Sequence, residues 1–232
     1  MTGSRRARTY YPIFADLHGR RCLVVGGGVI AQRKVTALMS CGAHVDVISP
    51  TVTPQLATYA RAGRIRYLPR AFRPRDLARM WVVIAATDDH AVNRLVARAA
   101  QAHRVFANVV DTPQQCSFIA PAMFRRGPLS IAVSTGGASP TLAKRLRTEL
   151  GRLGGPHYTQ MLSLLISLRP AAHRQLPTFT DRKRYFDQLV SGRVFDLVRA
   201  GKRRAARHEA CRVLAGVRDV ASRVHGQTRS IS

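Results

Sequence analysis

Three consecutive glycines follow a short apolar run near the start of the chain, within the sequence CLVVGGGVIA at residues 22–31. Glycine loses more backbone entropy on folding than other residues, so a cluster of this kind requires a reason. Between a predicted strand and a predicted helix, Gly26, Gly28 and Ala31 match the G-x-G-x-x-A pattern of dinucleotide-binding sites. In that pattern the first glycine permits a sharp turn, and the second lets a pyrophosphate approach the backbone at the helix N-terminus. A tight turn without a ligand is the alternative, and the strand–turn–helix context favours the dinucleotide site.

A second group of polar residues lies in AATDDHAVN at 85–93 and in NVVDTPQQCSF at 108–118. Both segments follow runs predicted to be strands, so we expect them at the carboxyl edge of the sheet, where open α/β sheets bind ligands. In the first segment, Asp88 or Asp89 is also a typical helix cap. In the second, Asp111 opens no obvious helix and is the carboxylate without a capping role. A turn-forming aspartate ahead of Thr-Pro is the alternative for Asp111.

The acidic residue that usually follows the second strand of a dinucleotide-binding fold is missing. Ser49, Pro50 and Thr51 occupy that place. Asp46 lies inside the predicted strand, and we expect it to belong to the packing or surface pattern of that strand. The sequence therefore specifies the choice between NAD and NADP only weakly, although backbone and hydroxyl contacts can still hold a ribose.

The first half of the chain alternates apolar runs with amphipathic stretches. The predicted strands are 21–25, 44–49, 65–68, 81–86 and 105–110, and the predicted helices are 30–40, 54–63 and about 89–101. Strands separated by helices imply right-handed crossovers and a parallel sheet. The predicted fold class is therefore α/β with a Rossmann-like parallel sheet, which we assign to residues 1–112.

The pattern changes after residue 112. Residues 117–134 contain two strand-like runs joined by Arg-Arg-Gly-Pro, which predicts a hairpin. Ser139 and Pro140 then open a helix with Leu142, Leu146 and Leu150 on one face. From residue 154 the chain is predicted to be helical, with breaks near Arg169-Pro170 and Ser191-Gly192. We therefore divide the remainder into a small α+β segment at 113–153 and a helical C-terminal domain at 154–232.

Composition narrows the class of protein. The 232 residues are 46% hydrophobic and 22% charged, which is typical of a globular protein rather than a disordered one. Cysteines 22, 41, 116 and 211 are far apart, so a zinc site or a disulfide framework is not expected. The basic N-terminus leads into no apolar segment, and the run at 81–86 is too short to cross a bilayer. We expect a cytoplasmic protein.

The chain is strongly basic, with 38 Lys and Arg against 12 Asp and Glu, a formal net charge of +26. Nucleic acid, an acidic small molecule and arginine-rich codon usage are the three explanations that this balance suggests. The basic residues are spread along the whole chain and mark out no single patch. The charge by itself therefore does not decide between them.

Residues 10–152 resemble the family of precorrin-2 dehydrogenases and sirohydrochlorin ferrochelatases, the dehydrogenase part of siroheme synthase. The resemblance runs through YPIFADLHGRRCLVVGGGVIAQRK, AATDD, NVVDTPQQCSFIAPA and LSIAVSTGGASPTLAKRLR. It implies NAD-dependent oxidation of precorrin-2 to sirohydrochlorin and, in some members, insertion of Fe²⁺ to give siroheme. It also implies that the NVVD aspartate, here Asp111, serves both activities, because both need a base near the ring.

The same resemblance implies contacts with the cofactor NAD. It places them at Val29-Ile30 and Pro50-Thr51, and the family tends to lack the missing acidic residue as well. No metal-binding residues are expected. If the two activities use different groups, His103 and His157 are the next candidates. The expected cofactor-binding residues are Gly26, Gly28, Val29, Ile30, Ser49, Pro50, Thr51 and Thr87.

The expected partners follow from the same resemblance. An anionic tetrapyrrole carries carboxylates around its rim, which arginine binds bidentately, and Fe²⁺ is a second substrate. A homodimer is expected through the segment 113–153. The alternative function is a basic, NAD-responsive regulatory or nucleic-acid-binding protein on a Rossmann scaffold. Asp111 and its flanking residues favour the enzyme, because a nucleic-acid binder needs neither.

Overall fold

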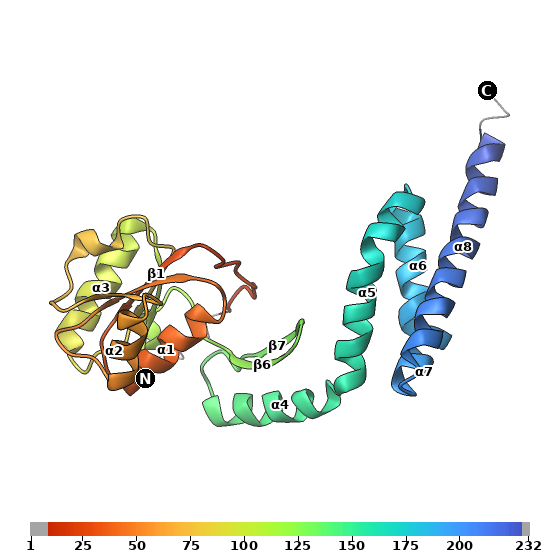
Figure 1. The fold of residues 1–232 in the computed structure, drawn as a ribbon. Coiled ribbons are helices and arrows are strands. Elements are labelled where there is room, and N and C mark those ends of the chain that lie inside the picture. The colour runs from red at the N-terminus through yellow and green to blue at the C-terminus, as the bar shows by residue number, and fades with distance from the viewer. Residues whose placement is uncertain (1–8, 229–232) are drawn as a thin grey trace, which may run out of the picture. The chain divides into compact units, whose positions relative to one another are not determined.

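The computed structural model describes residues 9–228, and the chain forms two compact units (Figure 1). The first unit contains the chain up to Ala120 together with Thr135–Ser139. The second contains Pro121–Ser134 and the chain from Pro140 onward. The first unit thus extends past the boundary expected at residue 112, and the expected segment 113–153 contributes residues to both units.

A five-stranded parallel sheet forms the centre of the first unit, in the order β3-β2-β1-β4-β5. This arrangement confirms the predicted Rossmann-like fold, and each strand lies within two residues of its predicted bounds. The central strands are apolar and almost wholly buried, as expected where helices cover both faces of a parallel sheet. The strands are β1 (Arg21–Val25), β2 (His44–Ile48), β3 (Arg66–Leu68), β4 (Val82–Ala85) and β5 (Phe106–Val109).

Helices cover both faces of the sheet. On one face, Cys22 and Val24 of β1 pack with α1 (Val29–Met39) and α2 (Pro54–Arg61). On the other face, the alternate residues Leu23 and Val25 share a core with α3 (His90–His103) and the short 3₁₀ helix η1 (Pro74–Leu77). This division follows from the two-residue side-chain period of a strand. A second 3₁₀ helix, η2 (Pro113–Gln115), follows β5.

The helix starts have identifiable local causes. Thr53 caps α2 with a side-chain oxygen 3.3 Å from the amide of Leu56, and Pro54 occupies the first position of the helix. Asp89 caps α3 by accepting hydrogen bonds from Ala91 and Val92 at 2.7 and 3.2 Å. Asp89 rather than Asp88 is therefore the cap.

A hairpin and a helix begin the second unit. Strands β6 (Ala122–Arg126) and β7 (Leu129–Val133) pair antiparallel, and α4 (Pro140–Leu153) packs on both. Arg125 and Arg126 belong to β6, so the connection is Gly127-Pro128 rather than the predicted Arg-Arg-Gly-Pro. Gly127 has a φ of +54°, a conformation that favours glycine. The leucine stripe of α4 (Leu142, Leu146 and Leu150) is exposed on this single chain.

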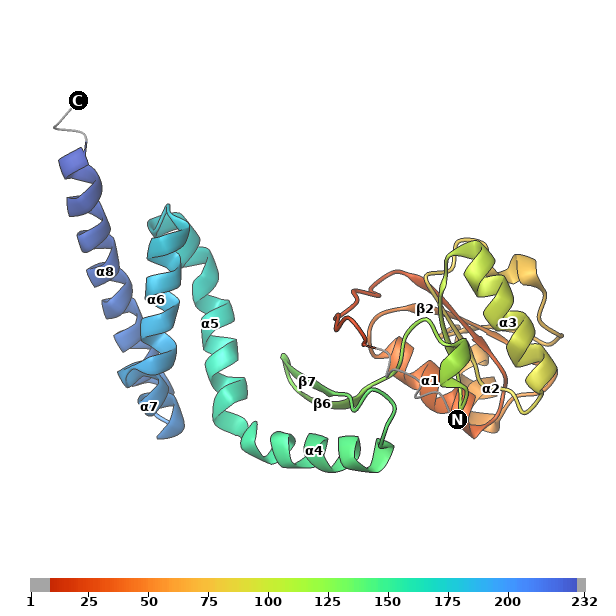
Figure 2. The ribbon, with the colours of Figure 1, turned by 180° about the vertical axis from the view of Figure 1, so that it is seen from behind.

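Four further helices complete the second unit (Figure 2). They are α5 (Pro156–Gln175), α6 (Phe179–Ser191), α7 (Arg193–Arg199) and α8 (Arg203–Thr228). The predicted break at Arg169-Pro170 is wrong, because α5 continues through Pro170 at the cost of one backbone hydrogen bond. The chain breaks instead before Thr178, whose side chain accepts from the amide of Asp181 and starts α6.

The predicted break at Ser191-Gly192 is confirmed, since α6 ends and α7 begins there. The helices enclose a core of their own around Tyr185 and Leu189, which are fully buried, and the Tyr185 hydroxyl donates to the carbonyl of Ala210 at 3.2 Å. No helix in the described part of the chain is both long and apolar enough to span a bilayer.

Candidate functional site

The first two glycines of the loop after β1 are required by the fold. Gly26 has a φ of +122°, and a Cβ there would lie 2.2 Å from the carbonyl oxygen of Ala86. A Cβ on Gly27 would lie 1.9 Å from the carbonyl oxygen of Thr51. The glycine loop is therefore held between the loops that follow β4 and β2, and no side chain fits at either position.

Gly28 differs from its two neighbours. It has an extended backbone with φ −78° and ψ −175°, which other residues adopt, and a Cβ there would meet no protein atom within 4 Å. Neither conformation nor packing explains why this residue is glycine. It stands at the start of α1, which has no side-chain cap and no acidic residue in its first turn. Because unpaired amides and the positive end of the helix dipole face outward there, a phosphate-bearing cofactor fits this cradle.

Two apolar side chains flank the cradle. Val29 is 58% exposed and Ile30 is 44% exposed, whereas Ala31, Val35 and Leu38 of the same helix are buried. Large apolar side chains exposed next to an open helix N-terminus provide a surface for the rings of a dinucleotide. The predicted pair Val29-Ile30 therefore lies exposed beside the cradle.

The loop after β2 carries the predicted Ser49, Pro50 and Thr51. Ser49 is buried with its hydroxyl near Gly27, whereas Pro50 and Thr51 are exposed. The carboxylate of Asp46 is not available to a ribose, because it accepts a hydrogen bond from Arg21 at 2.6 Å and is almost fully buried. Asp46 thus belongs to the packing of its strand, as expected.

Thr87 organises the loop between β4 and α3. Its hydroxyl lies 3.0 Å from both the carbonyl of Asp89 and the side-chain oxygen of Asn93. The amide of Asn93 donates back to the carbonyl of Thr87 at 2.9 Å, and Asn93 is buried. The hydroxyl donor and the backbone carbonyl of Thr87 are therefore used within the loop, which leaves the lone pairs of its hydroxyl oxygen for a cofactor.

Asp111 lies in the turn that ends β5. Its φ is +57°, and the amide of Thr112 donates to the carbonyl of Val109 across the turn at 3.3 Å. Its side chain is exposed and has no hydrogen bond or ion pair with any described residue. The structure therefore confirms that Asp111 shapes a turn, and its carboxylate is engaged by no described residue, so the catalytic role stays a prediction.

A partly buried network of hydrogen bonds from the segment after the turn holds the turn in place. Cys116 accepts a hydrogen bond from the amide of Val109 at 3.1 Å, and its thiol lies 3.4 Å from the carbonyl of Thr112. Asn108 is buried and donates to the carbonyl of Phe118 at 3.2 Å. These bonds hold the returning segment 116–118 against the end of β5.

The topology brings the predicted residues to one edge of the sheet. The segments that begin at Gly26, Ser49, Ala86 and Val110 follow the ends of four parallel strands, so all lie at the carboxyl edge. His103 is the last residue of α3 and lies at the opposite edge from the Asp89 cap. His157 belongs to the second unit, where its ring packs against Tyr158 and Phe195.

Sequence reasoning missed three residues that build the site. Gly27 makes the tightest approach of the loop, and the run of three glycines was a signal for it. Asn93 and Cys116 stabilise the loops after β4 and β5 through hydrogen bonds, and nothing in their sequence neighbourhood indicated those partners. Within the described residues no group of three or more His, Cys, Asp or Glu side chains could hold a metal ion.

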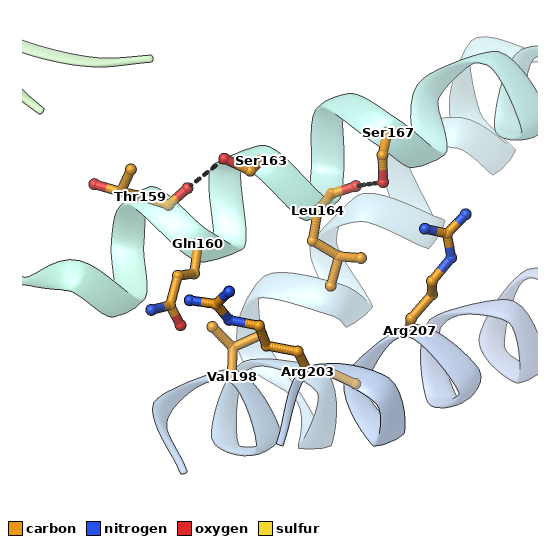
Figure 3. Close-up of a pocket in the computed structure, with 9 residues that line it drawn as sticks. Thr159, Gln160, Ser163, Leu164, Ser167, Val198, Arg203 and Arg207 are labelled. Carbon is orange, nitrogen blue, oxygen red and sulfur yellow. Dashed lines mark hydrogen bonds between the residues drawn. The ribbon is translucent and has the colours of Figure 1, made fainter. Parts of the chain in front are cut away.

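A pocket of about 410 Å³ lies in the second unit between α5, α7 and α8, and Figure 3 shows its lining. Arg203 and Arg207 extend from α8 toward α5, and Leu164 on α5 and Val198 on α7 supply apolar side chains to the lining. Two of its hydroxyls are used within α5, since Ser163 and Ser167 donate to carbonyls of that helix at 2.9 and 2.7 Å. None of the residues predicted for the cofactor or for catalysis lines this pocket.

Three family models match the chain in succession. Residues 13–122 match the family described as putative NAD(P)-binding. Residues 126–153 match the family described as sirohaem biosynthesis protein central. Residues 157–214 match the sirohaem synthase dimerisation region, which lies beyond the segment 113–153 expected to form the dimer.

Individual proteins show the same similarity. The siroheme synthase of Methylobacillus flagellatus is 43% identical over 205 residues, which cover 88% of this chain and 44% of that protein. The siroheme synthase of Escherichia coli O17:K52:H18 is 42% identical over 180 residues, covering 78% and 39%. The chain thus spans less than half the length of these relatives.

A match to one solved structure covers most of both chains. SirC, a precorrin-2 dehydrogenase, superposes with a TM-score of 0.71 at 29% identity. The match covers 88% of this chain and 100% of the SirC chain. The similarity therefore extends over the sheet and into the second unit rather than over the glycine loop alone.

Proposed function

The chain belongs to the siroheme synthase family, and on this premise we propose that it catalyses the NAD-dependent oxidation of precorrin-2 to sirohydrochlorin. In the balanced reaction one hydride passes from precorrin-2 to NAD⁺ and one proton passes to a base. The likeness to SirC supports this step, because that protein is a precorrin-2 dehydrogenase whose whole length is covered.

The observation that carries the proposal is the open space over Gly28. Gly26 and Gly27 are explained by protein atoms next to them, whereas Gly28 is explained only by a ligand group that must approach the backbone. Its place at the uncapped start of α1 suits the pyrophosphate of a dinucleotide. We therefore assign the pyrophosphate to Gly28 and the amides that follow it.

The remaining contacts with the cofactor follow from the strand ends. Val29 and Ile30 form the apolar surface beside the pyrophosphate, and the backbone of Pro50 and Thr51 faces the adenosine ribose. Ser49 and Thr87 shape the loops after β2 and β4, and Gly26 permits the turn after β1. When bound, NAD⁺ supplies the hydride acceptor.

Asp111 is the base in this proposal. Its carboxylate is exposed at the carboxyl edge of the sheet and is not engaged by any described residue. Oxidation of the ring releases a proton, and a positioned carboxylate accepts it in the same step in which the hydride leaves. A general base must be held in a defined position and be able to accept a proton. A carboxylate that is fixed on a turn and engaged by no described residue meets both requirements.

Insertion of Fe²⁺ into sirohydrochlorin is the finer part of the proposal. Metal insertion removes protons from pyrrole nitrogens, and the macrocycle itself supplies the nitrogen ligands. Asp111 accepts those protons in the same position in which it acts during oxidation. Fe²⁺ is a substrate in this step, and no resident metal site is proposed.

The tetrapyrrole and a second copy of the chain are the proposed partners. The rim carboxylates of the substrate suit a protein with 38 Lys and Arg residues. The match to a dimerisation region at 157–214 supports a homodimer, and Phe179 in that region is 74% exposed on the single chain. The leucine stripe of α4 is exposed as well, which keeps the segment 113–153 as a second candidate surface.

Anaerobic incubation with precorrin-2 and NAD⁺ tests the proposal directly. We expect the absorbance of NADH and of sirohydrochlorin to rise together, and a further change when Fe²⁺ is added. Absence of both products with a folded, NAD⁺-binding protein would contradict the dehydrogenase assignment. Retention on heparin at physiological salt without turnover would favour the basic regulatory or nucleic-acid-binding alternative.

A further inference from the structure

A second pocket lies beside the edge strand of the sheet in the first unit. Its volume is about 550 Å³, and its walls come from α3, from β5 and from the segment after the Asp111 turn. Arg94, Arg98 and Gln101 line it from one face of α3, while Gln114 and Gln115 line it from η2 and its end. None of the residues predicted for the cofactor or for catalysis lines it.

Two uncompensated cations face this pocket. Arg94 and Arg98 stand one turn apart on α3, and neither forms an ion pair with a described carboxylate. No acidic residue lines the pocket. Like charges at this spacing repel each other and destabilise the helix. An anion between the two guanidinium groups removes that destabilisation.

A buried polar atom in the same pocket lacks a partner. The side-chain oxygen of Gln115 is buried and forms no hydrogen bond with any described residue. A buried polar group without a hydrogen-bond partner destabilises the folded state. Rotation of the amide by half a turn places an N–H donor at the same point, because the two ends of the group are interchangeable in shape. A shift of this side chain toward the pocket therefore brings a donor from the wall to a ligand held beside the arginines.

We propose that this pocket binds an oxyanion, a carboxylate or phosphate group, held by Arg94, Arg98 and Gln115. Gln115 follows Asp111 by four residues, and the backbone amide of Gln115 donates to the carbonyl of Thr112 at 3.0 Å. An occupied pocket therefore fixes η2 and, through it, the turn that carries Asp111. The oxyanion is either a free ion or a rim carboxylate of the tetrapyrrole, and the second source rests on the proposed function.

The first arm of the test uses inorganic phosphate at constant ionic strength, titrated calorimetrically into the full chain. We expect the Arg94→Gln/Arg98→Gln variant to bind phosphate at least about 10-fold more weakly, the value of one charge-assisted hydrogen bond. Arg61→Gln/Arg66→Gln is the matched control, because it removes the same charge beside β3 at the opposite edge of the same sheet. The control is expected to bind phosphate as the wild type does.

Gln115→Leu separates a binding role from a folding role. Removing the unpartnered oxygen is expected to raise the melting temperature of the ligand-free protein while it weakens phosphate binding. A merely structural residue would not change these two quantities in opposite directions. If the melting temperature falls and phosphate affinity is unchanged, Gln115 supports the loop only and the proposed site is wrong.

The second arm uses sirohydrochlorin, followed by its change in absorbance on binding. Weaker sirohydrochlorin binding by Arg94→Gln/Arg98→Gln, with no phosphate binding by the wild type, identifies a rim carboxylate as the occupant. Phosphate binding that these substitutions abolish, with sirohydrochlorin affinity unchanged, identifies a free oxyanion. If neither affinity differs between this variant and the wild type, the proposal is overturned. A wild type that binds phosphate but no sirohydrochlorin would refute the proposed function and not this site.

Discussion

The sulfur of Cys116 lies 3.1 Å from the amide nitrogen of Val109 and 3.3 Å from the carbonyl oxygen of the same residue. Val109 is the last residue of β5, and its carbonyl also accepts from Thr112 to close the turn around Asp111. The side chain of Cys116, which follows the turn, is thus hydrogen-bonded to the strand that precedes the turn. The position of Asp111, the proposed base, depends on these hydrogen bonds.

Replacing Cys116 by alanine is expected to slow the proposed reaction by loosening that turn. The amide of Val109 loses its acceptor, and one lost hydrogen bond corresponds to about a 2–10-fold lower kcat. The KM for NAD⁺ is expected to stay unchanged, because the glycine loop lies after a different strand. Cys116→Ser keeps a donor and an acceptor and is expected to recover part of the rate. A variant with normal kcat and a raised KM for NAD⁺ would refute this role.

Substitution of Gly28 by aspartate is expected to abolish NAD⁺ binding and to preserve the fold. A Cβ there meets no protein atom within 4 Å, but the side chain occupies the proposed pyrophosphate position and adds a negative charge. Calorimetric titration with NAD⁺ measures the binding, and circular dichroism reports the fold. Unchanged affinity would show that the glycines form a turn and nothing more.

Gly27→Ala is the matched contrast to the Gly28 variant. Its Cβ would lie 1.9 Å from the carbonyl oxygen of Thr51, so the backbone of one loop must shift. We expect the free energy of unfolding to fall by about 1–3 kcal/mol, the usual cost of overpacking. If thermal unfolding of Gly27→Ala matched the wild type while Gly28→Asp unfolded, the roles assigned to the two glycines would be reversed.

Cofactor preference is expected to be modest, with NAD⁺ favoured over NADP⁺. No acidic residue stands directly after β2 to repel a 2′-phosphate. The carboxylate within β2, that of Asp46, is buried in its ion pair with Arg21. Arg33 and Lys34 lie on α1 and can tolerate the extra phosphate. Initial-rate kinetics with both cofactors measure the ratio of kcat/KM, and a strong preference for NADP⁺ would contradict this expectation.

The ion pair of Asp76 makes stability depend on pH. Burial acts to raise the pKa of Asp76, but the hydrogen bond from Arg70, the backbone amide of Arg73 and the nearby positive charge together hold that pKa below its usual value. The bond is bidentate, with distances of 2.8 and 2.7 Å. A lowered pKa in the folded state stabilises the protein above about pH 4, and this stabilisation is lost as the pH falls further.

Asp76→Asn is therefore expected to lower the free energy of unfolding by about 1–3 kcal/mol near neutral pH, as for hydrogen bonds to charged groups. The difference from the wild type is expected to shrink as the pH is lowered toward about 3, below the usual pKa of aspartate. Urea unfolding at a series of pH values measures it. Asp88→Asn, at an exposed aspartate, is the control. A difference that stays constant with pH would exclude the ion pair as its cause.

Asp111→Asn is expected to keep cofactor binding and to lose the chemistry. Asparagine preserves the size of the side chain and tolerates a positive φ, but it cannot accept a proton. The dehydrogenase rate is expected to fall by about 10²–10⁴-fold, the usual contribution of a positioned acid–base group. Fe²⁺ insertion is expected to fall with it.

Two results would count against Asp111 as the base. Oxidation of precorrin-2 at a near wild-type rate would reduce Asp111 to a turn residue. Loss of dehydrogenation with intact Fe²⁺ insertion would separate the two activities. His157 would then be the histidine to test first, because His103 lies at the amino edge of the sheet, away from the Asp111 turn.

The amino-acid sequence by itself determined the fold class and the place of the candidate site. Apolar runs such as 21–25 and 81–86, separated by helical periodicity, specify a parallel sheet, because both features depend on residues close together in the chain. Gly26, Gly28 and Asp111 could be located for the same reason, since each follows a strand whose end is visible in the sequence.

Only the tertiary structure decided which of these residues the fold explains and which it does not. Gly27 is held by Thr51 and Gly26 by Ala86, whereas Gly28 faces open space, and sequence spacing cannot distinguish these cases. The sequence predicted a break at Pro170, but a helix tolerates the loss of one hydrogen bond when the rest of it is packed. Burial, long-range hydrogen bonds and open space depend on residues far apart in the chain, so they are determined only when the chain has folded.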